Sequence, residues 1–198
     1  MNYYISFVDS FSRYTWILLL KSKSDAKNAV IHFIRQAENL TNQKLKTIQT
    51  DGGSEFKTLK EFFSEKGINH RITCPHTSEQ NGIVERKHRH IVDTGLTLLA
   101  HASMPLKFWP DAFTTAVFLI NRMPTKVLRN KTPLEILFNS KPDYSFLKTF
   151  GCLCYPCTRP YNQHKLSFRS LPCTFLGYAT SQKLSLIHIS EPTRLRCI

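Results

Sequence analysis

Two carboxylates stand at positions where a protein could hold a divalent metal. Asp51 ends the β-like run KLKTIQTD and precedes two glycines that permit a sharp turn, so its side chain is predicted at the rim of a sheet, where ligands of open α/β sheets gather. Glu85 lies in the first turn of a predicted helix, within QNGIVERKHRH. Carboxylate oxygens bind hard cations, and a pair of Mg²⁺ or Mn²⁺ ions can activate an attacking oxygen and stabilise a leaving one.

Each acid also has a purely structural interpretation. Aspartate is common beside glycine in turns, and glutamate is favoured at the positive end of a helix dipole. Asp9 follows the first predicted strand and would complete a three-carboxylate site with Asp51 and Glu85, but it also suits a hairpin turn. The residue types alone leave these alternatives open.

Basic residues follow Glu85 directly. Arg86, Lys87 and Arg89 alternate with two histidines, and Arg89 lies one helical turn after Glu85 on the same face. A carboxylate beside a basic strip suits metal chemistry on a phosphodiester, because the cations position the polyanion while the acids hold the metal.

The composition favours a polyanionic partner. The chain carries 27 Lys and Arg against 14 Asp and Glu, a formal charge of +13, which is typical of proteins that bind nucleic acid. No apolar run is long enough for a transmembrane helix, and the first residues do not resemble a signal peptide. Six cysteines without a secretion signal indicate reduced thiols and an intracellular location.

The hydrophobic pattern predicts an α/β chain with a small β-rich C-terminal part. Prolines and glycines become frequent after about residue 147, and FGCLCYP and CTFLGYA there read as strands of a small barrel. The predicted elements are strands at 3–8 and 14–20, a helix at 24–40 capped by Ser24, a strand at 44–50, a helix at 54–66, a strand at 68–73, a polar loop at 74–82, and helices at 83–101, 110–121 and 133–138.

A cysteine cluster offers a different kind of site. Cys152, Cys154 and Cys157 are followed by His164 and Cys173, and thiolates are good zinc ligands. The intervals match no familiar zinc motif, so buried, reduced cysteines are the stronger interpretation.

The motifs VDSFSRYTWILLLK, IQTDGGSEF and CPHTSEQNGIVERKHRHI resemble, in order and spacing, the integrase core of copia-type long-terminal-repeat retrotransposons. The resemblance covers residues 1–183 and implies a ribonuclease-H-like mixed sheet with flanking helices. It also implies a three-acid site with two Mg²⁺ or Mn²⁺ ions, in which Asp51 matches the second acid and Glu85 the third. The part that resembles the core is residues 1–145. Residues 146–183 resemble the Src-homology-3-like barrel that follows this core in the family.

The sequence departs from the family pattern at both ends. The family's first acid lies on the strand before NYYISFVD, so Asp9 matches a turn position, and we expect the first strand and first acid to precede residue 1. We also expect the chain to lack the upstream His/Cys zinc-binding region that such integrases usually carry. The segment LSLIHISEPTRLRCI, residues 184–198, has no family counterpart and is expected to be an artefactual or disordered tail.

The resemblance implies an integrase that trims the ends of element DNA and joins them to target DNA, acting in the nucleus and as a homo-oligomer in the intact protein. Arg86, Lys87 and Arg89 would hold the DNA backbone, and Asn81 and Gly82 would let the loop before Glu85 move. Without the first acid, we expect this chain to be inactive and marginally folded. The alternatives are a non-catalytic nucleic-acid-binding remnant and a zinc-dependent interaction module; a plain ribonuclease H fits the motif order less well.

Overall fold

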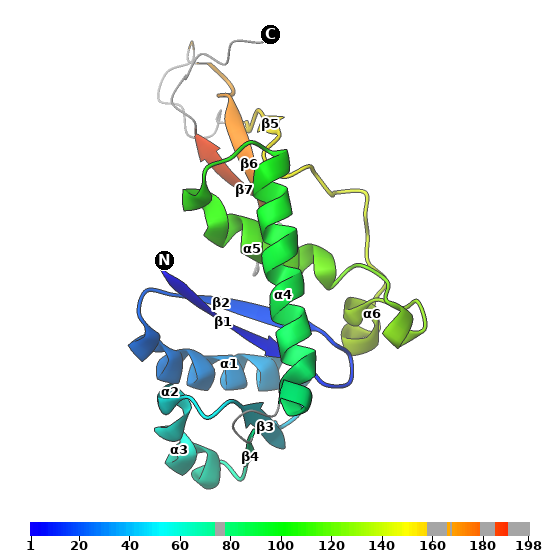
Figure 1. Cartoon of the computed structure of the whole chain (residues 1–198). Coiled ribbons are helices and arrows are strands. Elements are labelled where there is room, and N and C mark those ends of the chain that lie inside the picture. The colour runs from blue at the N-terminus through cyan, green and yellow to red at the C-terminus, as the bar shows by residue number, and fades with distance from the viewer. Residues whose placement is uncertain (74–77, 158–165, 167, 179–184, 190–198) are drawn as a thin grey trace. The chain divides into compact units, whose positions relative to one another are not determined.

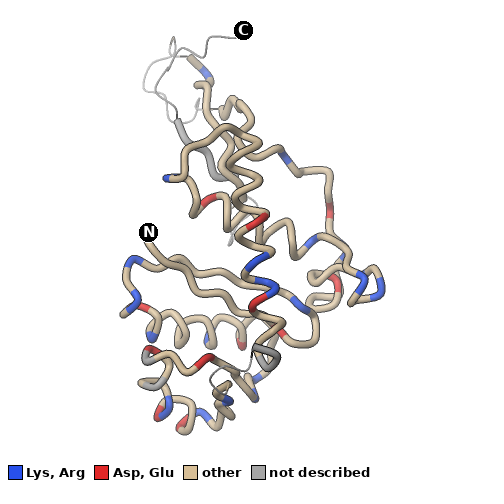
Figure 2. The backbone as a smooth tube through the Cα atoms, in the orientation of Figure 1, with Lys and Arg blue, Asp and Glu red and all other residues tan. Residues whose placement is uncertain are grey.

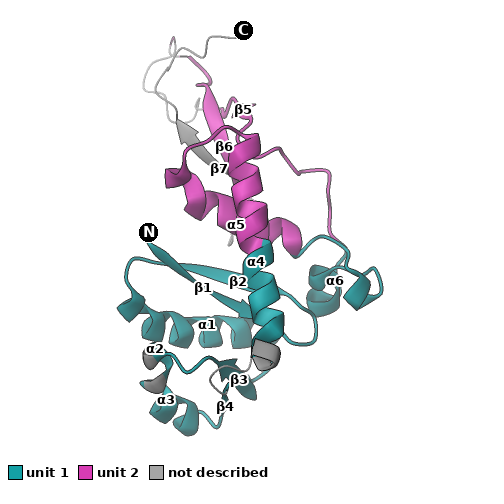
Figure 3. Cartoon of the chain, viewed as in Figure 1, with its two compact units in different colours: residues 1–90, 121–141 teal, residues 91–120, 142–198 magenta. Residues whose placement is uncertain are grey.

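The computed structural model describes residues 1–73, 78–157, 166, 168–178 and 185–189 (Figure 1). The chain forms two compact units, coloured separately in Figure 3. Unit 1 contains residues 1–90 and 121–141, and unit 2 contains residues 91–120 and 142–198. The chain is therefore divided at other places than the sequence-based boundary near residue 145, because the segment 91–120 groups with the C-terminal residues.

Unit 1 contains two pairs of strands and the helices that cover them. Strands β1 and β2 pair antiparallel, from Tyr3 opposite Leu20 to Val8 opposite Thr15, which confirms the predicted hairpin. Strands β3 and β4 pair parallel, from Thr47 beside Asn69. The elements are β1 (Tyr3–Val8), β2 (Thr15–Leu20), η1 (Lys23–Asp25), α1 (Ala26–Thr41), β3 (Thr47–Thr50), α2 (Ser54–Lys57), α3 (Lys60–Glu65), β4 (Asn69–Ile72), the first half of α4 (Ser78–His101), η3 (Lys126–Leu128) and α6 (Pro133–Phe138).

The start of α1 differs from the prediction in its cap. Ser22, and not Ser24, begins the helical segment: its hydroxyl accepts from the Ser24 backbone N–H at 3.3 Å, and its own N–H donates to Asp25 Oδ2 at 2.9 Å. This is a capping box, in which serine and an acid three residues later satisfy each other's backbone donors. A 3₁₀ turn, η1, therefore precedes α1.

The core of unit 1 lies between α1, α3 and one face of both strand pairs. The ring of Phe7 on β1 stacks on Phe33 of α1, with centroids 3.7 Å apart, and Ile48 of β3 packs against the same cluster. Full burial of one side chain of this size stabilises the folded state by roughly 1.5–3 kcal/mol. The buried cluster consists of Val30, Phe33, Ile34, Leu59, Phe63 and Ile68.

The predicted mixed sheet occurs as two separate pairs. Among the described residues, β1 is hydrogen-bonded only to β2, and β3 only to β4. Both pairs nevertheless pack on α1, so they present the same side to one core. The edges of β1 and β3 that face away from their partners carry backbone groups without strand pairing.

A buried amide joins β2 to the segment after α5 (Trp109–Ile120). Asn121 Oδ1 accepts from the Thr15 N–H at 2.9 Å, and Asn121 Nδ2 donates to the Thr15 carbonyl at 2.7 Å. We expect Asn121→Ala to lower the free energy of unfolding by about 2–4 kcal/mol, because it leaves two buried backbone groups unsatisfied. Urea unfolding measures the change, with Asn28→Ala on the exposed face of α1 as the matched control. Equal midpoints for the two variants would contradict the prediction.

Unit 2 combines α5 with a three-stranded antiparallel sheet in the order β5–β6–β7. Its elements are the second half of α4, η2 (Leu106–Phe108), α5, β5 (Leu153–Cys154), β6 (Cys173–Tyr178) and β7 (Ser185–Ile189). The predicted helix at 110–121 is confirmed, and β5 and β6 lie within the two runs that were predicted as strands. Strand β7 lies inside residues 184–198, where the sequence predicted an unrelated tail.

The helix and sheet of unit 2 are fastened together by polar and aromatic contacts. Thr115 Oγ1 on α5 donates to the Leu176 carbonyl on β6 at 3.2 Å. The ring of Phe118 stacks on Tyr178, with centroids 4.1 Å apart. The Tyr178 hydroxyl accepts from the Lys148 N–H at 2.7 Å and donates to the Lys148 carbonyl at 3.2 Å. These contacts explain why residues 91–120 belong with the C-terminal sheet.

Candidate metal and nucleic-acid site

Asp51 lies directly after β3, at the carboxyl end of a parallel strand pair. Its side chain is exposed, and Oδ1 accepts a long hydrogen bond of 3.3 Å from the Gly53 N–H. The parallel pairing continues past the strand ends, because the Thr73 N–H donates to the Thr50 carbonyl at 3.1 Å. The predicted position of Asp51 at the rim of the sheet is therefore confirmed.

The alternation of side chains along β3 defines the side on which Asp51 lies. Ile48 packs toward the α1 core, and Thr50 is buried with its hydroxyl 2.8 Å from His70 Nε2. Successive side chains of a strand point to opposite faces. Gln49 and the following Asp51 thus belong to the face turned away from α1.

Glu85 is exposed on α4, and α4 lies on this same side of the strands. The ring of His88 stacks on Tyr4 of β1, with centroids 5.6 Å apart and planes 14° apart. Ile5 and Phe7 of β1 pack toward α1, so Tyr4 points to the opposite face. The helix that carries Glu85 and the face that carries Asp51 are therefore on one side of unit 1.

The alkaline behaviour of Tyr4 gives a test of this packing. Burial raises the pKa of Tyr4 to about 12 from its ordinary value of 10.0. The folded state then holds this proton more tightly than the unfolded state, so the free energy of unfolding is expected to fall as pH rises from about 10 to about 12. Urea unfolding across this range, compared with Tyr4→Phe, measures the effect. An unchanged pH dependence in the variant would contradict it.

Asp9 has a structural role in the β1–β2 turn. Its Oδ2 accepts hydrogen bonds from the Ser12 N–H at 2.7 Å and the Ser12 hydroxyl at 2.6 Å. The hairpin-turn interpretation is confirmed, and the carboxylate is occupied within its own turn. No group of three His, Cys, Asp or Glu side chains able to hold a metal is found among the described residues.

Glu55 is an acid that the sequence interpretation did not select. A Cβ atom built on Gly53 would lie 3.1 Å from Asp51 Oδ1 and 3.1 Å from Glu55 Oε2, so these carboxylates flank the space that Gly53 leaves open. Gly53 has an ordinary φ of −55°, so its role is to leave room and not to make a left-handed turn. The exposed oxygen donors of Asp51 and Glu85 suit Mg²⁺ or Mn²⁺. The sequence feature that could have identified Glu55 is its position, four residues after Asp51.

The predicted basic strip divides into two kinds of residue. Arg86 and Arg89 are exposed, whereas Lys87 is half-buried. Burial, and then the positive charge of Arg13 in the β1–β2 turn, lowers the pKa of Lys87. Figure 2 shows further Lys and Arg residues around the loop that carries α6. Arg13 was not selected from the sequence, because only the fold brings the turn beside α4.

Lys87→Met is expected to raise the free energy of unfolding by about 1 kcal/mol or less, since it removes a half-buried charge beside another cation. The lowered pKa also means that stability of the unsubstituted chain increases as pH rises toward the ordinary value of 10.5, a dependence that the variant loses. Urea unfolding at several pH values measures both effects, with Lys60→Met on exposed α3 as the control. A loss of stability in Lys87→Met would contradict this account.

Asn81 and Gly82 lie within α4, so their prediction as loop residues was wrong. The helix begins at Ser78, five residues before the predicted start at Ile83. One glycine costs a helix only about 1 kcal/mol relative to alanine, which the good helix formers around it offset. Residues 74–77 of the predicted loop lie outside the described residues.

The cysteines of β5 and β6 lie close together as free thiols. Cys154 pairs with Cys173 across the two strands, and its Sγ donates to the Cys173 carbonyl at 3.3 Å. Burial, and then the neighbouring Cys173 and Cys152, raises the pKa of the Cys154 thiol. His164, the other candidate zinc ligand, lies outside the described residues.

Comparisons with known proteins identify two domain families in the chain. Residues 2–78 match the integrase core domain family, and residues 152–190 match the retroviral polymerase SH3-like domain family. The first match contains Asp51, and the second contains β5, β6 and β7. The chain is 51% identical over 194 residues to the retrovirus-related Pol polyprotein from transposon RE1 of Arabidopsis thaliana, and this match covers 98% of the chain and 13% of the polyprotein.

Solved structures show the same fold. The HTLV-2 integrase catalytic core domain in complex with magnesium matches with a TM-score of 0.51 at 24% identity, over 67% of this chain and 82% of that one. The simian T-cell lymphotropic virus intasome in complex with the PP2A regulatory subunit B56 gamma matches with a TM-score of 0.54 at 17% identity, over 94% of this chain and 69% of that one.

The fold is of the ribonuclease-H-like class, to which retroviral integrase catalytic cores belong. Residues 2–78 belong to the integrase core domain family and residues 152–190 to the retroviral polymerase SH3-like domain family, and the relatives of the chain are Pol polyproteins of copia-type transposons. It spans 13% of the length of the matched curated polyprotein. No helix in the described part is both long and apolar enough to span a membrane.

Proposed function

We propose that the chain is part of an integrase that processes the 3′ ends of element DNA and transfers them to target DNA, with Asp51 and Glu85 as metal ligands. The observation that carries the proposal is the pair of exposed carboxylates on one side of unit 1, one at a strand end and one on a helix with exposed arginines. Divalent ions, when bound, would activate the attacking oxygen and stabilise the leaving oxygen of a phosphodiester.

The residues of this chain would divide the remaining work. Asp51 and Glu85 supply the negative oxygen donors, and Arg86 and Arg89 hold the DNA backbone so that a water or a 3′-hydroxyl attacks in line. Lys87, half-buried beside Arg13, would add to the positive potential that attracts the DNA backbone to the two arginines. We also propose that the intact protein acts on DNA as an oligomer, because one matched structure is an intasome and another is a trimeric catalytic core. Action in the nucleus is part of the same proposal.

A third acid is needed for two metals, and we propose that a strand between β1 and β3 supplies it. The unpaired edges of these two strands, packed on the same core, support this proposal. The chain alone would then be inactive. The test is strand transfer of a labelled oligonucleotide in Mn²⁺, with the chain alone and with a chain extended by its upstream genomic sequence.

Only the extended chain is expected to give product. Turnover by the chain alone, abolished by Asp51→Asn, would show that the two acids suffice. Protection from hydrogen exchange tests the open edges in the same samples: the amides of residues 3–8 that face away from β2 are expected to exchange quickly in the chain alone and slowly in the extended chain. Strong protection in both samples would contradict the missing strand.

A second candidate is a non-catalytic nucleic-acid-binding remnant. It is favoured by the net charge of +13 and by the exposed Arg86 and Arg89. This function predicts salt-sensitive DNA binding that needs no metal and persists after Glu85→Gln. An extended chain that binds DNA but never transfers strands would favour the remnant over the enzyme.

A further inference from the structure

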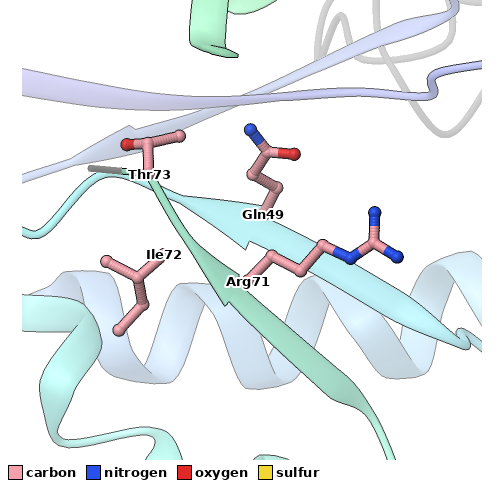
Figure 4. A pocket seen from close by; sticks show the side chains of 4 residues that line it. All are labelled: Gln49, Arg71, Ile72 and Thr73. Carbon is pink, nitrogen blue, oxygen red and sulfur yellow. The ribbon is translucent and has the colours of Figure 1, made fainter. Parts of the chain in front are cut away.

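A pocket of about 430 Å³ lies over the parallel pair β3–β4, lined by Gln49, Arg71, Ile72 and Thr73. Gln49 and Arg71 are direct partners in the strand register, so they stand side by side. Figure 4 shows the Gln49 amide and the Arg71 guanidinium extending from the two strands, with α1 behind them. The pocket volume falls within the range of roughly 300–1,000 Å³ that is usual for ligand sites.

The pocket adjoins Asp51. Thr73, which lines the pocket, is bonded to the residue before Asp51: its N–H and its hydroxyl donate to the Thr50 carbonyl at 3.1 Å and 3.4 Å. Gln49 and Asp51 lie two residues apart and on the same face of β3. A ligand in the pocket would therefore sit at the carboxyl ends of the parallel strands, next to the proposed metal ligand.

The lining groups select an anion with oxygen acceptors. Arg71 is exposed, and no carboxylate among the described residues forms an ion pair with it. A guanidinium binds phosphate through two parallel hydrogen bonds, and hydroxyl and amide side chains are common partners of the DNA backbone. None of the described residues that line the pocket is acidic.

We propose that this pocket binds one phosphodiester of the DNA strand on which Asp51 acts, with Arg71 as the main contact and the Gln49 amide as an additional hydrogen-bonding group. The inference rests on the proposed function and adds to it a contact on the strand side of the site, away from the α4 arginines. It makes β4 a positioning element for DNA and gives Arg71 a role that its sequence position did not indicate.

The first test measures binding of the full chain to a short DNA duplex, without metal, at several salt concentrations. Arg71→Ala is expected to weaken binding about 3- to 10-fold and to lower the slope of log affinity against log salt by about 1. Arg35→Ala is the matched control, because Arg35 is also an exposed arginine and lies on α1, behind the strands. Arg71→Lys is expected to keep the salt slope and to lose only part of the affinity.

Equal affinities for Arg71→Ala and Arg35→Ala would overturn the pocket proposal while leaving the proposed function intact. An unsubstituted chain that binds no DNA at low salt would instead overturn the proposed function, and the pocket with it. Circular dichroism of both variants checks that they are folded, which their exposed positions favour.

The second test needs no substitution. Phenylglyoxal modifies accessible arginines, and mass spectrometry compares its rate at Arg71 and Arg35 in the full chain. DNA is expected to slow modification of Arg71 at least about threefold and to leave Arg35 unchanged. Inorganic phosphate at the same phosphate concentration separates a free anion from DNA, and it is expected to protect neither residue. Equal modification of Arg71 with and without DNA, or protection by inorganic phosphate alone, would overturn the proposal.

Discussion

Glu85→Gln in the chain extended by its upstream strand is expected to reduce strand transfer more than about 100-fold, because loss of a residue that only hydrogen-bonds to a metal ligand already costs metal sites about 10- to 100-fold. Glutamine keeps the size of the side chain and one oxygen but lacks the negative charge that a divalent cation requires. Glu85 is exposed on α4, so the substitution leaves the packing of the helix on β1 unchanged. Asp51→Asn is expected to have an effect of the same size.

Three measurements separate the metal role of Glu85 from a structural one. Strand transfer gives the rate, titration calorimetry with Mn²⁺ gives metal affinity, and DNA binding without metal is expected to change less than about twofold, because no phosphate contact is lost. Glu65→Gln on exposed α3 is the matched control and is expected to change none of them. Retained turnover in Glu85→Gln, or a parallel loss of DNA binding, would remove Glu85 from the metal site.

The sequence predicted the local parts of the site well. The apolar run of β2 is visible in a short stretch of sequence: Trp16 and Leu18 pack toward α1, and Ile17 and Leu20 are buried outside that cluster. The place of Asp51 was predictable too, because a strand followed by Gly-Gly ends at one definite residue. The residue types already indicated a divalent metal and a polyanionic partner, and the family resemblance added the integrase reaction and the three-acid site.

Other features depend on contacts between distant segments and could not be predicted in this way. Lys87 was grouped with Arg86 and Arg89 because the three are adjacent, but the fold turns Lys87 toward Arg13, which is 74 positions earlier in the chain. No sequence pattern indicated Arg71 as a binding residue, because the proposed pocket forms only when β4 places Arg71 beside Gln49 of β3. The grouping of α5 with β6 likewise depends on Thr115 and Leu176, far apart in sequence.

Gly177 illustrates the same limit, and its substitution is expected to have a large effect on stability. It lies in β6 with φ +123°, where the register with β7 shifts by one residue, and a Cβ atom there would overlap the Thr115 hydroxyl. Gly177→Ala therefore combines backbone strain of about 1–3 kcal/mol with overpacking of about 1–3 kcal/mol. We expect unit 2 to lose about 3–5 kcal/mol, a large part of the stability of a typical domain.

A double-mutant cycle separates the two causes. Thr115→Ala removes the overlapping hydroxyl, so in the Gly177→Ala background it is expected to restore the steric part, about 1–2 kcal/mol, but not the backbone part. Gly52→Ala is the matched control, since Gly52 has no heavy atom within 4 Å of the added Cβ and no positive φ. Hydrogen exchange of β6 measures the loss within unit 2. Additive effects of the two substitutions would show that Thr115 does not oppose the new methyl group, and the loss would then come from the backbone of Gly177 alone.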